Sequence, residues 1–181
     1  MDFVAYVRET LAQLSANQIY FVISSAVAYL AFGLITIWYV WPSIKDRPPK
    51  VALTPLLLYA CLRVNGLMFL MPGLASPDLP SAFAVPTAYG DLSSAILALL
   101  AIACLRFSSA LAVLMLWLFN IVGFCDLLYA NISSFKDHVD PVLLGGAYYL
   151  AAINVPAMMV VHIIIFAYLL TGRATPKRRA S

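Results

Sequence analysis

Three charged residues lie inside long apolar stretches of this sequence: Arg63, Asp91 and Asp126. Charged side chains are costly in an apolar span, so they are rare there and usually face the interior of a helix bundle. An arginine guanidinium is a planar fork of N–H donors that can bind two carboxylates at once. We therefore expect Arg63 to pair with one or both aspartates, and these three residues form the core of the candidate site.

Two asparagines, Asn65 and Asn120, lie in the same stretches, near the predicted mid-membrane level. A buried asparagine can hydrogen-bond across neighbouring helices, which stabilises a pair by about 0.6–2 kcal/mol. We place both residues in the candidate polar cluster, below the charged groups. Simple helix-to-helix hydrogen bonding is the alternative interpretation.

Three interpretations of this cluster remain open. In the first, a pocket opens outward, Arg63 binds a small anionic or lipid-like ligand, and Asp126 tunes the site or carries a proton, because two acids face one base. In the second, the Arg–Asp pairs only hold helices together in a structural or assembly subunit, and Asp91 caps the start of a helix. In the third, the cluster serves an enzyme acting on a lipid or quinone. A cavity of about 300 Å³ or more at Arg63 would favour ligand binding, whereas a closed contact would favour the structural role.

Other catalytic chemistry has little support in the sequence. The cysteines are isolated and form no CxxC pair, and they lie at Cys61, Cys104 and Cys125. His138 and His162 are predicted on opposite sides of the membrane, so they cannot share a metal or a haem. His162 is interpreted as a lone histidine held by hydrogen bonding. Nucleophile-elbow, zinc-protease and phosphate-loop motifs are absent. We expect no cofactor, no metal and a non-enzymatic function.

The composition indicates an integral membrane protein. Of 181 residues, 64% are hydrophobic and 10% are charged, whereas a soluble domain carries about 25% charged residues. This balance excludes a disordered chain and a nucleic-acid module with a basic surface. The net charge of +3 comes from the C-terminal tail and is interpreted as a topology signal. The predicted partner is the lipid bilayer, with no nucleic acid.

The apolar stretches predict an all-α bundle of five transmembrane helices within residues 18–172. An amphipathic interfacial helix at 1–17 precedes the bundle and a basic tail at 173–181 follows it. The predicted spans are about 19–41, 51–71, 91–105, 110–130 and 142–171.

The connections carry their own predictions. Residues 72–90 contain four prolines and several apolar residues, which predicts a long loop folded over the helix ends. Residues 131–141 predict a polar loop. Pro156, in the middle of a single long fifth span, predicts a kink.

The distribution of lysine and arginine predicts the orientation. One side has only Arg8 and Lys136, and the other side has Lys45, Arg47, Lys50, Arg106, Arg173, Lys177, Arg178 and Arg179. The N-terminus is therefore predicted outside and the C-terminus in the cytoplasm. The alanine-rich composition and the uncleaved first span favour a bacterial inner membrane. Five short spans expose much surface, so we expect a homo-oligomer or a partner membrane protein as further candidates.

Overall fold

The computed structural model describes residues 15–107, 109–137 and 139–171, with the side chains of all but 109 and 110. Within these ranges the chain forms helices and short connections, so the predicted all-α bundle is confirmed. Five helices are long and apolar enough to cross a membrane, and they are Ala16–Ile44, Pro49–Leu70, Ser81–Phe107, Leu111–Lys136 and Leu150–Leu170. Nearly all of the predicted N-terminal interfacial helix and the whole basic tail lie outside the described residues.

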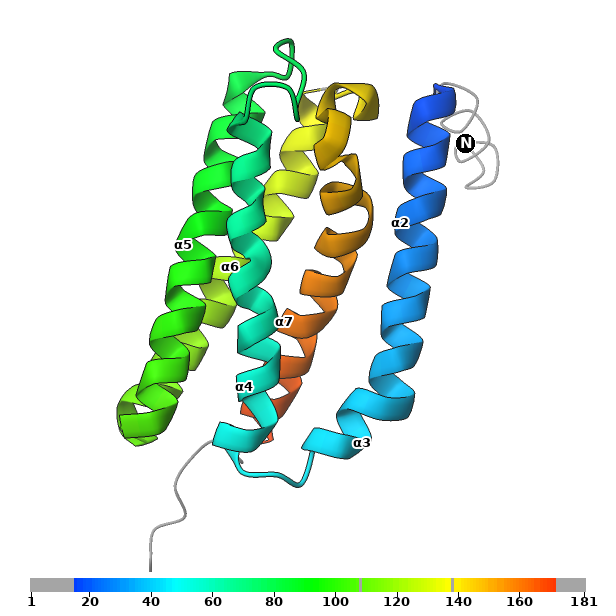
Figure 1. The fold of residues 1–181 in the computed structure, drawn as a ribbon. Coiled ribbons are helices and arrows are strands. Elements are labelled where there is room, and N and C mark those ends of the chain that lie inside the picture. The colour runs from blue at the N-terminus through cyan, green and yellow to red at the C-terminus, as the bar shows by residue number, and fades with distance from the viewer. Residues whose placement is uncertain (1–14, 108, 138, 172–181) are drawn as a thin grey trace, which may run out of the picture.

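The helices run alternately up and down the bundle (Figure 1). The first span consists of α2 (Ala16–Ile35), a π-helical turn η1 (Thr36–Val40) and α3 (Trp41–Ile44). The second joins α4 (Pro49–Ala60) to the 3₁₀ helix η2 (Cys61–Leu70). The next two are α5 (Ser81–Phe107) and α6 (Ser109–Lys136). The last part comprises the 3₁₀ segment η3 (Pro141–Ala147), the π-helical turn η4 (Leu150–Asn154) and α7 (Val155–Leu170).

Helix α2 lies at the edge of the bundle (Figure 1). Ser15 and Gln18 form a reciprocal capping box that fixes its start. Its inner face contacts α7, η3 and η4, partly through Phe21, whose ring packs edge-on against Tyr148. Ala28 is the one buried residue of α2. The rest of α2 presents an apolar surface suited to lipid.

The second span changes its helical period at Cys61, two residues before Arg63. Residues 61–70 form a 3₁₀ helix with about three residues per turn. The buried residues of this part of the chain recur at the same spacing, and they are Ala60, Arg63, Gly66 and Phe69. The 3₁₀ period therefore aligns Arg63 and Gly66 on the face toward α5, and it leaves Asn65 exposed.

The third span begins ten residues earlier than predicted. Helix α5 starts at Ser81 and includes Pro86, so the prediction of a loop through residue 90 is wrong. Its buried residues recur at helical spacing and include Phe83, Thr87 and Asp91. Burial of this face outweighs the hydrogen bond lost at Pro86. Asp91 is consequently an interior helix residue, and its predicted role as a helix N-cap is wrong.

The fourth span is also longer than predicted. Helix α6 continues to Lys136, so most of the predicted 131–141 loop is helical. Within it, Asn131 and Ser134 bond their side chains to backbone carbonyls of their own helix. These local bonds let polar residues extend the helix. Asp126 is thus ten residues from the end of α6, rather than one turn from it.

The fifth span is interrupted rather than continuous. Gly145 has a φ of 53° and breaks the helical path within η3. Further along, the π-helical turn η4 immediately precedes Pro156, which is at the second position of α7. A wider turn before a proline accommodates the missing N–H donor. The membrane-spanning part is therefore Leu150–Leu170.

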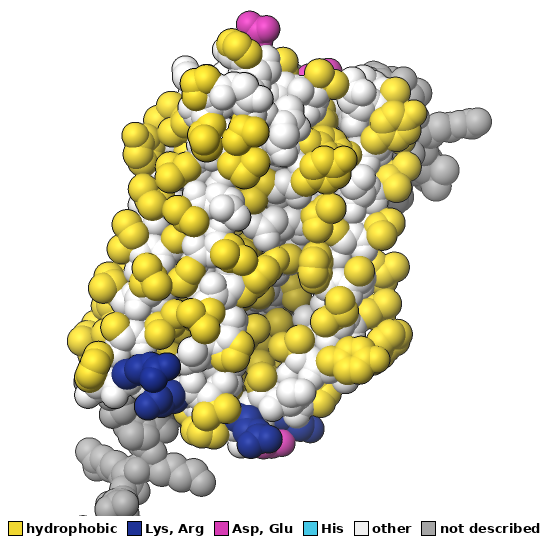
Figure 2. Space-filling model, in the orientation of Figure 1, with side chains coloured by type: hydrophobic (Ala, Val, Ile, Leu, Met, Phe, Trp, Pro, Cys, Tyr) yellow, Lys and Arg dark blue, Asp and Glu magenta, His cyan; other side chains and the backbone are white. Residues whose placement is uncertain are grey.

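Two apolar clusters fill the interior. One includes Leu53, Leu116 and Ile165, and the other includes Phe69, Phe83 and Leu144. Along η2 and α5, the buried charged residues Arg63 and Asp91 lie between segments that belong to these two clusters. The face of the bundle drawn in Figure 2 is largely apolar between its two ends.

Candidate functional site

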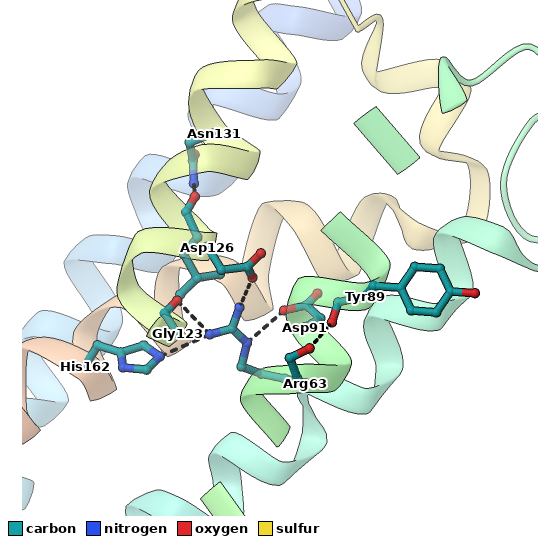
Figure 3. Close-up of polar contacts among 9 residues, drawn as sticks. Arg63, Tyr89, Asp91, Gly123, Asp126, Asn131 and His162 are labelled. Carbon is teal, nitrogen blue, oxygen red and sulfur yellow. Dashed lines mark hydrogen bonds and ion pairs between the residues drawn. The ribbon is translucent and has the colours of Figure 1, made fainter. Parts of the chain in front are cut away.

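Arg63 is the centre of a buried hydrogen-bond network (Figure 3). Its Nε donates to Oδ1 of Asp91 at 2.7 Å, and an Nη2 hydrogen is donated to Oδ2 of Asp126. Its Nη1 donates to the carbonyl oxygen of Gly123 at 2.8 Å and lies 3.2 Å from Nε2 of His162. We refer to these five residues and Asn120 as the Arg63 network. It joins η2, α5, α6 and α7.

Arg63 itself is closed to the outside. Its side chain is 1% exposed, and its four hydrogen bonds leave one of the five guanidinium N–H groups without a described partner. An anionic ligand would have to displace an aspartate to reach it. The geometry therefore fits ion pairing between helices better than anion capture by Arg63.

The two carboxylates are less enclosed than the guanidinium between them. The side chains of Asp91 and Asp126 are 10% and 13% exposed. Each uses one oxygen to bind Arg63, and the other oxygen, Oδ2 of Asp91 and Oδ1 of Asp126, has no described hydrogen bond. Figure 3 shows both carboxylates beside the guanidinium, and one oxygen of each carboxylate is joined to it by a dashed line. Two carboxylates and one guanidinium leave a formal surplus of one negative charge.

His162 joins the network as a neutral ring. Nδ2 of Asn120 donates to the carbonyl oxygen of His162 at 3.1 Å, so the amide oxygen of Asn120 is free to accept from Nδ1 of His162 at 2.8 Å. This assigns the ring proton to Nδ1 and leaves Nε2 as an acceptor for Arg63. A second proton on Nε2 would point at the guanidinium. Phe119 stacks on the ring with centroids 4.9 Å apart.

Three glycines provide the space in which these polar side chains lie. A Cβ on Gly66 would overlap the carboxylate of Asp91, and a Cβ on Gly90 would overlap that of Asp126. A Cβ on Gly123 would stand 2.6 Å from Cε1 of His162 and 2.9 Å from Nη1 of Arg63. Only glycine therefore permits the close approach of helix backbone and charged side chain at these positions.

Two buried hydroxyls lie on the same face of α5 as Asp91. Thr87 is one turn before Asp91, Ser94 is one turn after it, and they are 4% and 0% exposed. Neither hydroxyl oxygen has a hydrogen-bond partner among the described residues. Buried polar groups without protein partners usually bond to water or to a ligand. The polar face of α5 thus extends one turn to either side of the carboxylate.

The structure brings together four of the five residues named from the sequence. Arg63, Asp91 and Asp126 are in direct contact, and Asn120 reaches Arg63 through His162. Asn65 is not part of the cluster, because it lies on the exposed side of η2.

Sequence reasoning missed His162 and the three glycines. The spacing of Asn120 and Gly123, one helical turn apart, was the available signal for a polar, closely packed stretch of α6. Another polar bond between spans joins Tyr59 Oη to Oδ1 of Asn154 at 2.8 Å.

Two cavities in the described part of the chain lie away from the network. A cavity of about 350 Å³ lies between the start of α2 and η3, and one of about 190 Å³ lies at the start of α4; no residue of the network lines either. No group of three or more His, Cys, Asp or Glu residues in the described ranges could hold a metal ion. The Arg63 network is therefore suited to ion pairing and to the binding of a proton or a cation.

The fold and the site together define a multi-pass integral membrane protein with a buried ionic network. Residues 20–170 match the model of a family described as a domain of unknown function, DUF8737, so the chain belongs to that family. No curated protein and no solved structure matches the chain significantly.

Proposed function

We propose that this protein is a non-enzymatic membrane protein that takes up a proton, or transports a small solute with one, at the Asp91–Asp126 pair. One observation carries the proposal: a buried carboxylate, Asp91, and a partly buried one, Asp126, share a single guanidinium that is already enclosed. His162, held as the neutral ring, adds no compensating charge. The network therefore carries one uncompensated negative charge unless a proton or cation is bound.

An uncompensated buried charge is energetically unfavourable. Transfer of an ionised carboxylate into an apolar interior costs many kcal/mol unless the group is paired or takes up a proton. Protonation of one carboxyl removes the surplus and turns its free oxygen into a hydrogen-bond donor. The pair then has one exchangeable proton and one fixed ion pair to Arg63.

In this proposal the proton reaches the carboxylates from the end of the bundle that carries residues 71–80. Their side chains retain partial exposure, whereas Arg63 does not. The unpartnered hydroxyl of Thr87 lies one helical turn nearer to that end of α5 than Asp91 does. A water or solute entering from that side would meet the acids before the guanidinium. This geometry favours a cationic or proton-donating partner over the small anionic ligand expected from the sequence.

Infrared spectroscopy of the protein in lipid nanodiscs tests the proposal directly. We expect a carbonyl stretch from a protonated carboxylic acid at neutral pH that shifts in deuterium oxide and disappears in Asp126→Asn or Asp91→Asn. Asp78→Asn, in the exposed loop before α5, is the matched control and should keep the band. Absence of the band in the wild-type protein, or its persistence in both network variants, would refute proton uptake at this pair.

A structural or assembly role is the second candidate. It is favoured by the way in which one arginine joins η2, α5 and α6 directly and α7 through His162. It is also favoured by α2, which buries little of its surface within the chain. A cysteine in place of Val27, which is 61% exposed, would form cross-linked dimers in membranes if α2 contacts a second copy. If the cysteine variant forms no more cross-linked dimer than the wild-type protein does, α2 does not contact a second copy at this residue.

For location, we propose a bacterial cytoplasmic membrane with the N-terminus outside and the C-terminus in the cytoplasm. Among the described residues, Lys45, Arg47, Lys50 and Arg106 gather at one end of the bundle, as cytoplasmic ends do. A fluorescent protein fused after the C-terminus should fluoresce, and alkaline phosphatase fused there should be inactive. The opposite result would reverse the orientation.

A further inference from the structure

A second potential binding site lies far from the Arg63 network, at the end of the bundle where α4 begins. A cavity of about 190 Å³ opens there among three helices. Its lining comes from the start of α4, the last turn of α5 and the first turns of α6: Pro48, Pro49, Lys50, Leu105, Ala112, Val113 and Leu116. The site is independent of the proposed proton uptake.

The cavity combines an apolar floor with a charged rim. Ala112 and Leu116 of α6 are 3% and 1% exposed and form its buried wall. Lys50 is exposed at the opening, and Arg106, also exposed, follows Leu105 directly in the last turn of α5. The positive groups therefore lie at the end of the bundle, while the apolar lining continues toward the membrane interior.

The surrounding surface is strongly positive. Four of the lysines and arginines in the described residues lie at this end, and Asp46 is the one acid there in the described ranges. Figure 2 shows dark blue side chains gathered at the lower end of a largely apolar face. A headgroup at this level would meet positive charge, and an acyl chain would meet apolar side chains, which is the arrangement of basic lipid sites between helices.

We propose that this cavity binds an anionic phospholipid, with an acyl chain against Val113 and Leu116 and the headgroup phosphate beside Lys50 and Arg106. A soluble phosphate would make no use of the apolar wall. A zwitterionic lipid would offer no net charge to the basic rim. The observations together therefore select a lipid with a negatively charged headgroup.

Thermal unfolding of the full-length protein in a neutral detergent, with added lipid, tests this assignment. Phosphatidylglycerol should raise the midpoint of unfolding in a saturable manner, and phosphatidylcholine with the same acyl chains should raise it much less. The double variant Lys50→Gln/Arg106→Gln should require roughly tenfold or more phosphatidylglycerol for the same shift, since each surface cation contributes about 1 kcal/mol. Lys136→Gln, which removes a cation at the other end of the bundle, should leave the response unchanged.

Two further arms identify which part of the lipid is recognised. Val113→Phe fills the cavity while it keeps both cations, so it should weaken the phosphatidylglycerol response. Glycerol phosphate, which has the charge but no acyl chain, should give no stabilisation at the same concentration. An equal response to both lipids, an unchanged response in the double variant, or full stabilisation by glycerol phosphate would overturn the proposal.

Discussion

The carboxylate of Asp126 lies against the backbone of Gly90, in the space that a side chain at residue 90 would occupy. The two residues belong to α6 and α5, which pack closely along their length. The same relationship recurs between Asp91 and Gly66. Each acid of the network therefore faces a glycine on the neighbouring helix, and the position of the charges depends on the absence of two side chains.

Gly90→Ala should therefore destabilise the protein. The added Cβ would force Asp126 away from Arg63, so overpacking and the loss of a charged hydrogen bond combine to about 2–4 kcal/mol. Thermal or denaturant unfolding in detergent measures this loss. Gly33→Ala in α2 is the matched control, because its Cβ would meet no atom within 4 Å; equal stability of the two variants would contradict the role given to Gly90.

Much of the fold could be predicted from the sequence, because apolar stretches of spanning length are a strong physical signal. The alternating direction of successive spans also predicted that Arg63 pairs with an aspartate, since it brings Arg63, Asp91 and Asp126 to the same half of the membrane. The errors arose where local geometry departs from a regular α-helix. Proline at residue 86 suggested a loop, yet the buried face of α5 extends the helix back to Ser81.

The positions predicted for Asn65 and His162 were wrong because the chain near each departs from a regular α-helix. With 3.6 residues per turn the orientation of Asn65 was open, but the 3₁₀ period of η2 directs it outward. His162 was placed too close to the cytoplasmic end, because the fifth span was counted from residue 142. Gly145 interrupts that span, so the spanning helix begins at Leu150 and His162 reaches the level of Arg63.

Asn120→Ala should destabilise the network and remove the hydrogen bond that fixes the tautomer of His162. Its amide satisfies both Nδ1 and the carbonyl oxygen of His162, and the loss of these buried bonds should cost about 1–3 kcal/mol. In the wild-type protein, ¹⁵N NMR should detect the Nδ1–H tautomer at neutral pH. Asn131→Ala, which loses one bond within α6, should cost clearly less. An Nε2–H tautomer in the wild-type protein would contradict the assigned hydrogen-bond directions.

Gly145 and Gly146 should respond differently to alanine. Gly145 has a positive φ, and a Cβ there would overlap the carbonyl oxygen of Leu74, whereas a Cβ on Gly146 would meet Leu74 at ordinary contact distances of 3.5–3.6 Å. Gly145→Ala should therefore cost about 1–3 kcal/mol and release the loop before α5, which is bonded to η3 through Gly146 N and Ser76 N. Limited proteolysis within residues 71–80 should be faster in Gly145→Ala and unchanged in Gly146→Ala. Equal rates would show that this backbone contact does not hold the loop.

The charge count predicts an order of stability among variants of the network. Arg63→Ala leaves the buried Asp91 and the partly buried Asp126 without a cation and should cost about 3–5 kcal/mol. Asp126→Ala leaves Arg63 paired with Asp91, a balanced ion pair, so it should cost only the lost hydrogen bond, about 1.5–3 kcal/mol. The double variant should cost less than the sum of the two, because the residues are in direct contact.

Unfolding of all four proteins in one detergent measures this order. A larger loss in Asp126→Ala than in Arg63→Ala would mean that Asp91 does not balance the charge of Arg63 once Asp126 is removed, which would contradict the charge count. The expected order has a further consequence for function. Because the Asp126 variants keep a balanced pair, they should remain folded, and a missing infrared band in Asp126→Asn can then be attributed to the lost proton site rather than to unfolding.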